Sequence, residues 1–117
     1  GSAALNTIKA AVFIAKYDGS NCNALWAKQS TGTTTDAAYG YSISADPNGN
    51  VFVTGCYWDP ITFSTITLPA HGQVDLFIAK YDKDGNVLWA KDAGGTDTDE
   101  GYSVSADAYG NVFVAEP

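Results

Sequence analysis

The sequence predicts an all-β protein built from repeated four-stranded antiparallel units. Three segments recur along the chain in the same order, and each is rich in Val, Ile, Phe, Tyr and Trp, the residues that favour strands. The segments are short and are bounded by Asp, Asn and Gly, which is typical of strands joined by turns. No stretch of about ten residues combines helical periodicity with helix caps.

The spacing of the repeated segments is nearly constant. Phe13 recurs 64 residues later in the motif FIAKYD, Trp26 recurs 63 residues later in LWAK, and Tyr41 recurs 61 residues later within GYSISAD and GYSVSAD. Repetition at a fixed period is the signature of architectures in which each unit buries its apolar face against the next. Residues 40–95 contain one complete unit of four strands. The preceding segment matches the last two strands of that unit, and the following segment matches its first two.

Three connections share the form Asp-x-x-Gly-Asn, at residues 46–50, 82–86 and 107–111. The Asp side chain can accept hydrogen bonds from turn amides, and Gly can take the positive φ that a tight hairpin needs. These turns are expected on one rim of the unit. The long connection 56–74 is expected to be a loop on the opposite rim, with Cys22 and Cys56 too far apart for a disulfide.

A four-stranded meander repeated in this way is the blade of a β-propeller. The predicted organisation is therefore one full blade flanked by two complementary half-blades. Residues 1–10 are expected to be a tag scar and lead-in, because Gly1-Ser2 resembles the remnant of a cleaved tag. The remaining boundaries are predicted as a half-blade of strands three and four at 11–39, the full blade at 40–95, and a half-blade of strands one and two at 96–117.

These motifs resemble the SBBP β-propeller repeat family of bacteria. The family pattern is matched by DLFIAKYD, GNVLWAK, GYSISAD and GNVFVTG, and the chain departs from it at Cys22-Asn23-Ala24, where Gly-Asn is replaced. The resemblance implies a propeller in a bacterial surface or secreted protein and no enzyme activity. The LWAK region is also similar to the tryptophan-docking repeat of quinoprotein propellers. There the Trp packs one blade on another, so no quinone cofactor is implied.

Two blade equivalents are too few to close a propeller, which needs about four to eight. A single chain would expose broad apolar blade faces and unpaired strand edges. Both would be covered if the C-terminal half-blade of one chain paired with the N-terminal half-blade of the next, in a head-to-tail ring. Such a homo-oligomer has four, six or eight blades in total, and we favour six or eight. A fragment cut from a longer propeller, or an engineered chain, is the alternative.

Candidate ligand-binding residues lie in the long connection, because binding residues concentrate on loops held by a rigid scaffold. Tyr57, Trp58 and Asp59 form an aromatic and acidic cluster that could bind a glycan or a protein ligand, and His71 lies nearby. The alternative is that Trp58 packs against the blade edge or a neighbouring chain. His71 has no second ligand or nucleophile beside it, so it forms neither a zinc site nor a catalytic triad.

The acidic segment containing Asp97, Asp99 and Glu100 has a spacing that Ca²⁺ could use, since hard cations favour carboxylate oxygens. The alternative is a solvated acidic loop. No other cofactor is expected. No catalytic constellation is found, because the serines of the GYSISAD and GYSVSAD strands have no base beside them.

Composition narrows the function classes. The net charge is −7 with only 16% charged residues, which argues against nucleic acid and against anionic membrane surfaces. No apolar run approaches the length needed to span a bilayer, so membrane insertion is not expected. Low charge with abundant Thr, Ser, Gly and Asn favours an extracellular or cell-surface protein. The leading hypothesis is a non-enzymatic scaffold or recognition module. A lectin-like multivalent ring comes second, and an enzyme with a central-channel pocket comes last.

Overall fold

The computed structural model describes residues 11–32, 38–70, 74–92 and 103–115. Within these ranges the chain forms strands and turns, and no described segment is helical. The strands, in chain order, are β1 (Phe13–Tyr17), β2 (Ala24–Gln29), β3 (Thr31–Gly32), β4 (Ala38–Ala45), β5 (Val51–Tyr57), β6 (Ile61–Phe63), β7 (Ile66–Leu68), β8 (Asp75–Tyr81), β9 (Val87–Asp92), β10 (Ser103–Ala106) and β11 (Val112–Ala115).

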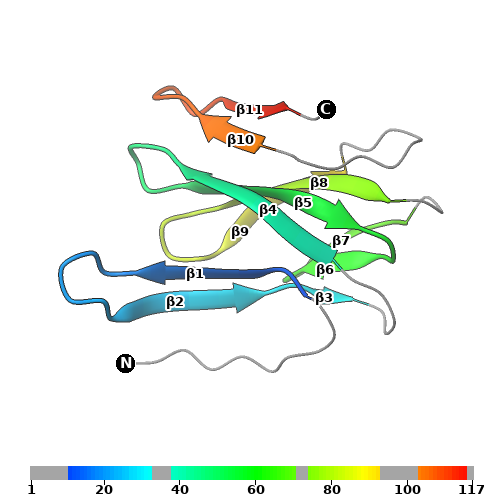
Figure 1. The fold of residues 1–117 in the computed structure, drawn as a ribbon, viewed down its shortest axis with the longest axis horizontal. Coiled ribbons are helices and arrows are strands. Elements are labelled where there is room, and N and C mark those ends of the chain that lie inside the picture. The colour runs from blue at the N-terminus through cyan, green and yellow to red at the C-terminus, as the bar shows by residue number, and fades with distance from the viewer. Residues whose placement is uncertain (1–10, 33–37, 71–73, 93–102, 116–117) are drawn as a thin grey trace.

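The centre of the molecule is an antiparallel four-stranded sheet with strand order β4-β5-β8-β9 (Figure 1). Strands adjacent in this sheet follow one another in the meander, apart from the insertion between β5 and β8. The hairpins β1-β2 and β10-β11 each form a separate two-stranded sheet. The structure therefore confirms the predicted all-β fold, with one complete blade flanked by two half-blades.

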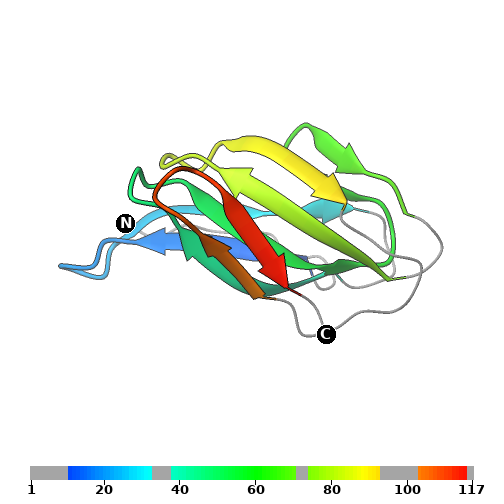
Figure 2. The ribbon, with the colours of Figure 1, turned by 90° about the horizontal axis from the view of Figure 1, so that it is seen from above.

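The two half-blades cover opposite faces of the central sheet (Figures 1 and 2). One face carries Val53 and Ala79, which share a buried cluster with Ile14 of β1. The other face carries Ser42, whose Oγ accepts a hydrogen bond from the backbone N–H of Val104 in β10. Successive side chains of a strand point to opposite faces of the sheet, so each side chain of the central sheet faces either the first or the second half-blade.

Aromatic residues dominate the core between the first half-blade and the central sheet. Phe77 is fully buried, with ring centroids 5.0 Å from Phe63 and 6.3 Å from Tyr57. Both ring pairs are tilted, by 47° and 55°, and aromatic quadrupoles favour such arrangements over a face-to-face stack. Thr54 is also buried, and its hydroxyl donates to the carbonyl of Phe77, so the buried polar atom is satisfied.

The connection between β5 and β8 is not the irregular loop that the sequence suggested. It contains the hairpin β6-β7, which pairs with β3 in a three-stranded sheet. Ile61 and Phe63 are buried while Thr62 lies between them, so this short stretch has the period of a half-buried strand. At the hairpin tip, Ser64 has a φ of 57°, the left-handed conformation that tight turns use. The alternation spans only three residues per strand, too few to distinguish it from a loop.

The Asp-x-x-Gly-Asn turns form as predicted. In the β8-β9 turn, Asp82 Oδ1 accepts from the backbone N–H groups of Asp84 and Asn86, and Oδ2 accepts from the Asn86 side chain. Gly85 has a φ of 87°. The same bonds recur around Asp46 and Asp107. They stabilise the ionised carboxylates and hold the pKa values of Asp46, Asp82 and Asp107 below the usual 3.8.

We predict that Gly85→Ala destabilises the chain more than Gly110→Ala does. Both positions have a left-handed φ, 87° and 86°, where a side chain costs about 1 kcal/mol. At Gly85 the new Cβ would also lie 2.9 Å from the Trp26 ring, whereas at Gly110 nothing lies within 4 Å. Thermal unfolding followed by circular dichroism should show the larger decrease in Tm for Gly85→Ala. Equal decreases would contradict the close packing of Trp26 on this turn.

We predict that stability falls as the pH is lowered below about 4, partly through these turns. Because the pKa of Asp82 is lowered in the folded state, its ionised form stabilises the fold above the unfolded pKa of 3.8, and this contribution is lost as the pH falls through the folded value. Asp82→Asn should therefore reduce the dependence of Tm on pH between pH 6 and pH 2. Asp84→Asn is the matched control from the same turn, since the Asp84 side chain accepts no hydrogen bond within the described residues. An unchanged pH profile for Asp82→Asn would argue against this role.

Candidate assembly interface

The predicted ligand cluster lies at the end of β5. Tyr57 is fully buried and its hydroxyl donates to the carbonyl of Pro69 over 2.8 Å. Burial, with a further contribution from Asp75 and Asp92, raises the pKa of Tyr57. Trp58 and Asp59 are half-buried.

The Trp58 ring meets Tyr39 edge to face, with centroids 5.6 Å apart. It also packs against a small buried cluster that contains Cys56 and Leu76. These contacts are those expected if Trp58 packs at the blade edge. They leave ligand binding at Trp58 and Asp59 a prediction.

The other predicted site residues lie outside the described residues. These are His71 and the acidic residues Asp97, Asp99 and Glu100. Among the residues that the structure describes, no three His, Cys, Asp or Glu side chains gather as a metal site would need. The described part of the chain also contains no helix long and apolar enough to span a membrane.

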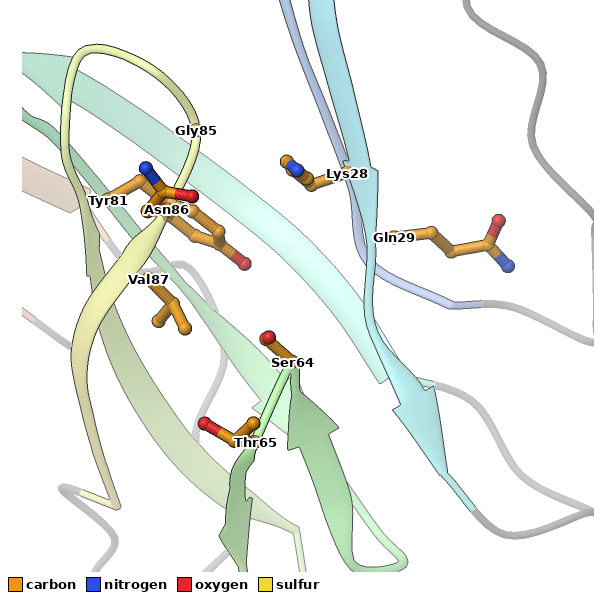
Figure 3. Close-up of a pocket in the computed structure, with 8 residues that line it drawn as sticks. All are labelled: Lys28, Gln29, Ser64, Thr65, Tyr81, Gly85, Asn86 and Val87. Carbon is orange, nitrogen blue, oxygen red and sulfur yellow. The ribbon is translucent and has the colours of Figure 1, made fainter.

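A polar cavity of about 320 Å³ lies where β2, the tip of the β6-β7 hairpin and the β8-β9 turn meet (Figure 3). The buried Tyr81 side chain directs its hydroxyl into this space, while Gln29 points away from it. Burial raises the pKa of Tyr81 to about 12, so the phenol stays protonated at neutral pH. The cavity can hydrogen-bond a small polar molecule, but its lining contains no nucleophile paired with a base. The lining residues are Lys28, Gln29, Ser64, Thr65, Tyr81, Gly85, Asn86 and Val87.

A second hollow, of about 400 Å³, follows the free side of β1 and is mostly apolar. It is lined by Phe13, Ile14, Ala15 and Tyr17 of β1, Gly40, Ser42 and Ile43 of β4, and Val53 of β5. In the complete blade, β8 is flanked by β5 on one side and by β9 on the other. β1 is the counterpart of β8, and within the described residues it pairs with β2 alone. The hollow therefore lies where two further strands would complete this half-blade.

Trp26 makes the contact between β2 of the first half-blade and the β8-β9 turn of the central sheet, at the outer strands of the two blades. Its indole Nε1 donates to the carbonyl of Lys83 over 2.9 Å, and Lys16 Nζ reaches the same oxygen at 3.2 Å. The Trp26 ring stacks on Tyr81 with centroids 6.3 Å apart. Gly85 allows this approach, because a Cβ there would lie within 3.0 Å of the ring. The resemblance of the LWAK region to docking repeats had implied a packing role for this Trp.

On the other face of the central sheet, two serines of β4 make the contact with β10, at the first strands of the two blades. Ser42 Oγ accepts from the backbone N–H of Val104, and Ser44 Oγ accepts from that of Ala106, both at 3.2 Å. Sequence reasoning considered these serines only as nucleophiles and so missed their structural role. The available signal was their recurrence as Ser103 and Ser105 at alternate positions of the equivalent strand, which places both on one face.

Equivalent residues of the two repeats differ sharply in burial. Tyr81 is 4% exposed, while its counterpart Tyr17 is 60% exposed. Phe52 is 0% exposed, while its counterpart Phe113 is 61% exposed. The same contrast separates buried Phe77 from exposed Phe13, and buried Val104 from exposed Ile43.

Phe13, Tyr17 and Phe113 lie on half-blade faces that have no neighbour in the single chain, whereas Ile43 lies on the central-sheet face that β1 covers only in part. These faces match the interior of a blade stack rather than a solvated surface. They are the candidate interface.

Comparisons with known proteins agree with this architecture. Residues 25–55, which run from β2 through β4 into β5, match the model of the SBBP β-propeller repeat. An uncharacterised WD repeat-containing protein of Acanthamoeba polyphaga mimivirus is 28% identical over 109 residues, covering 87% of this chain and 8% of that protein. The chain thus spans less than a tenth of that relative. The match confirms the resemblance recognised from the motifs: residues 25–55 of this chain carry a β-propeller repeat of the SBBP type.

Proposed function

We propose that this chain is a non-enzymatic β-propeller module that assembles head-to-tail with further copies of itself into a closed ring. The ring serves as an extracellular scaffold or recognition surface. The observation that carries the proposal is the burial contrast between equivalent residues. Phe13, Tyr17, Ile43 and Phe113 are exposed at positions whose counterparts form the core between blades.

The missing neighbours are two strands on each side, and the chain itself has the right ones. β11 is the counterpart of β5, and β1 is the counterpart of β8. Applying the β5-β8 register to these strands pairs Val112 of one copy with Tyr17 of the next, and Val114 with Ala15. This pairing would satisfy both open strand edges, which otherwise invite uncontrolled association.

Closure restricts the number of copies. Each chain supplies two blade equivalents, so a dimer, trimer or tetramer would have four, six or eight blades, and propellers of these sizes are known to close. We favour six or eight. Additional repeats in a longer chain would present the same strands, and the mass in solution distinguishes the two arrangements. A chain that stays at its own mass of 12.3 kDa at all concentrations would overturn self-assembly.

We predict that Phe113→Glu converts the assembly to monomers. Phe113 is exposed in the single chain, so its replacement leaves the blades folded, but in the ring it would bury an unpaired carboxylate. Light scattering and native mass spectrometry should show association weakened at least about tenfold, with unchanged circular dichroism. Leu88→Glu is the control, because Leu88 is 49% exposed although the neighbouring half-blade is present. Equal association of the two variants would contradict the proposed interface.

A lectin-like ring is the second candidate, and the exposed ring of Tyr39 against Trp58 favours it. Several weak sites on one ring would bind a multivalent glycan more tightly than one site could. If this function exists, a glycan array should show binding that Trp58→Ala reduces about tenfold or more, the loss expected for an aromatic stacking residue. An assembled wild-type protein that binds no glycan on the array would remove this candidate while leaving the scaffold role in place.

A further inference from the structure

The contact of Trp26 with the β8-β9 turn is a template for a second contact that the described residues do not contain. Trp26 lies on β2 and reaches forward to the turn of the following blade. Trp89 occupies the same place on β9 of the complete blade. The turn that Trp89 would reach belongs to the outer half of the blade after it, and that outer half is absent from the C-terminal hairpin β10-β11.

Trp89 already faces in the required direction. It is paired in register with Lys80, which is paired with Phe52, so the three side chains share one face of the sheet. This is also the face on which Ser44 meets β10. The Trp89 ring lies 6.2 Å from that of Phe52, and within the described residues its indole N–H has no acceptor. Trp26, its counterpart, makes that hydrogen bond.

The receiving turn is present at the other end of the chain, between β1 and β2. Asp18 Oδ1 accepts from the backbone N–H of Ser20, as Asp82 Oδ1 does from that of Asp84. Gly19 therefore holds the place of Lys83, whose carbonyl receives Trp26. A side chain added at Gly19 would meet nothing within 4 Å, so this part of the turn is open to a partner. Tyr17 beside it is exposed, whereas Tyr81 at the equivalent place lies under Trp26.

We propose that Trp89 of one copy docks on residues 18–23 of the next copy. The indole N–H donates to the Gly19 carbonyl, the ring stacks on Tyr17, and the Lys80 ammonium turns toward the same carbonyl. Lys80 now lies over the Phe52 ring at 5.3 Å, and Lys16 makes the equivalent bond within one chain. The docking rests on the proposed ring and identifies the residues that join its outer part.

The inner part of the same junction follows by the same reasoning. Ser42 and Ser44 accept from β10 within the chain, so Ser103 and Ser105 would accept from the equivalent amides of the next copy, those of Ile43 and Ala45. Both serines are exposed in the single chain. Each junction between copies thus repeats both contacts that already hold the blades within a chain, the Trp contact at the outer strands and the serine contacts at the inner strands.

The two junctions differ at one position. Cys22, with a φ of 63°, stands where Gly85 lies under Trp26, and its turn is one residue longer. The thiol of Cys22 is exposed in the single chain, and docking would cover it with the Trp89 ring. Because Cys56 is buried, reaction with a soluble thiol reagent reports on Cys22.

The test compares the wild-type chain with Trp89→Phe and Trp26→Phe. Each variant keeps an aromatic ring and loses one indole N–H, between copies in the first case and within the chain in the second. Native mass spectrometry across a dilution series should show Trp89→Phe rings dissociating at about fivefold higher concentration, the equivalent of one net hydrogen bond. Trp26→Phe should instead lower Tm while leaving the dissociation concentration within about twofold. In parallel, a maleimide should label Cys22 about tenfold more slowly in wild-type rings than in Phe113→Glu monomers, because docking covers the thiol.

The outcomes separate the two proposals. Wild-type rings that dissociate at the same concentration as Trp89→Phe rings, and whose Cys22 is labelled as fast as in monomers, would overturn the docking and leave the ring standing. A wild-type chain that remains monomeric would overturn both. Faster labelling of Cys22 in Trp89→Phe rings at equal ring concentration would locate the docking at this turn.

Discussion

A propeller blade is a sheet with two apolar faces, and neither face can be left in water. The central sheet of this chain satisfies most of the requirement because one half-blade packs on each side, Ile14 and Trp26 on one face and Val104 on the other, while Ile43 of β4 stays exposed. The half-blades themselves do not satisfy it. Each has a covered face, an exposed face and an open edge strand. The same need to cover apolar faces therefore applies at the two ends of the described fold.

The repeat explains how much of this could be read from the sequence. Strands, turns and blade boundaries follow from motifs that occur twice, because two copies with the same spacing identify both the pattern and its register. The packing role of Trp26 was recognisable from the resemblance of its motif to docking repeats. The β6-β7 hairpin occurs once, in the insertion between β5 and β8, and its strands of three residues are too short for periodicity to identify. Its structure depends on tertiary packing of Ile61 and Phe63 against the blade, which a local pattern does not contain.

The roles of individual polar residues were harder to predict. Ser42 and Ser44 lie on a strand whose composition suggests only a half-buried surface, and their bonds to β10 depend on the distance between two blades. Tyr57 shows the reverse case. Its neighbours Trp58 and Asp59 suggested an exposed cluster, but the end of β5 turns its ring into the core, where Pro69 accepts from its hydroxyl. The sequence predicts where a residue lies along a strand, but it does not predict which residue of a neighbouring element the side chain contacts.

The β6-β7 hairpin has a consequence for the symmetry of any ring built from this chain. The hairpin is inserted between the second and third strands of the complete blade, whereas in a blade shared by two copies the same point is a break between chains. Blades that look equivalent near the axis would therefore alternate at the periphery, one bearing a hairpin and its polar cavity and the next bearing neither. The outer surface would have the rotational order of the chains, half that of the blades. A partner that recognises the periphery would find its contact points two blades apart, so the spacing of a multivalent ligand would report the number of chains.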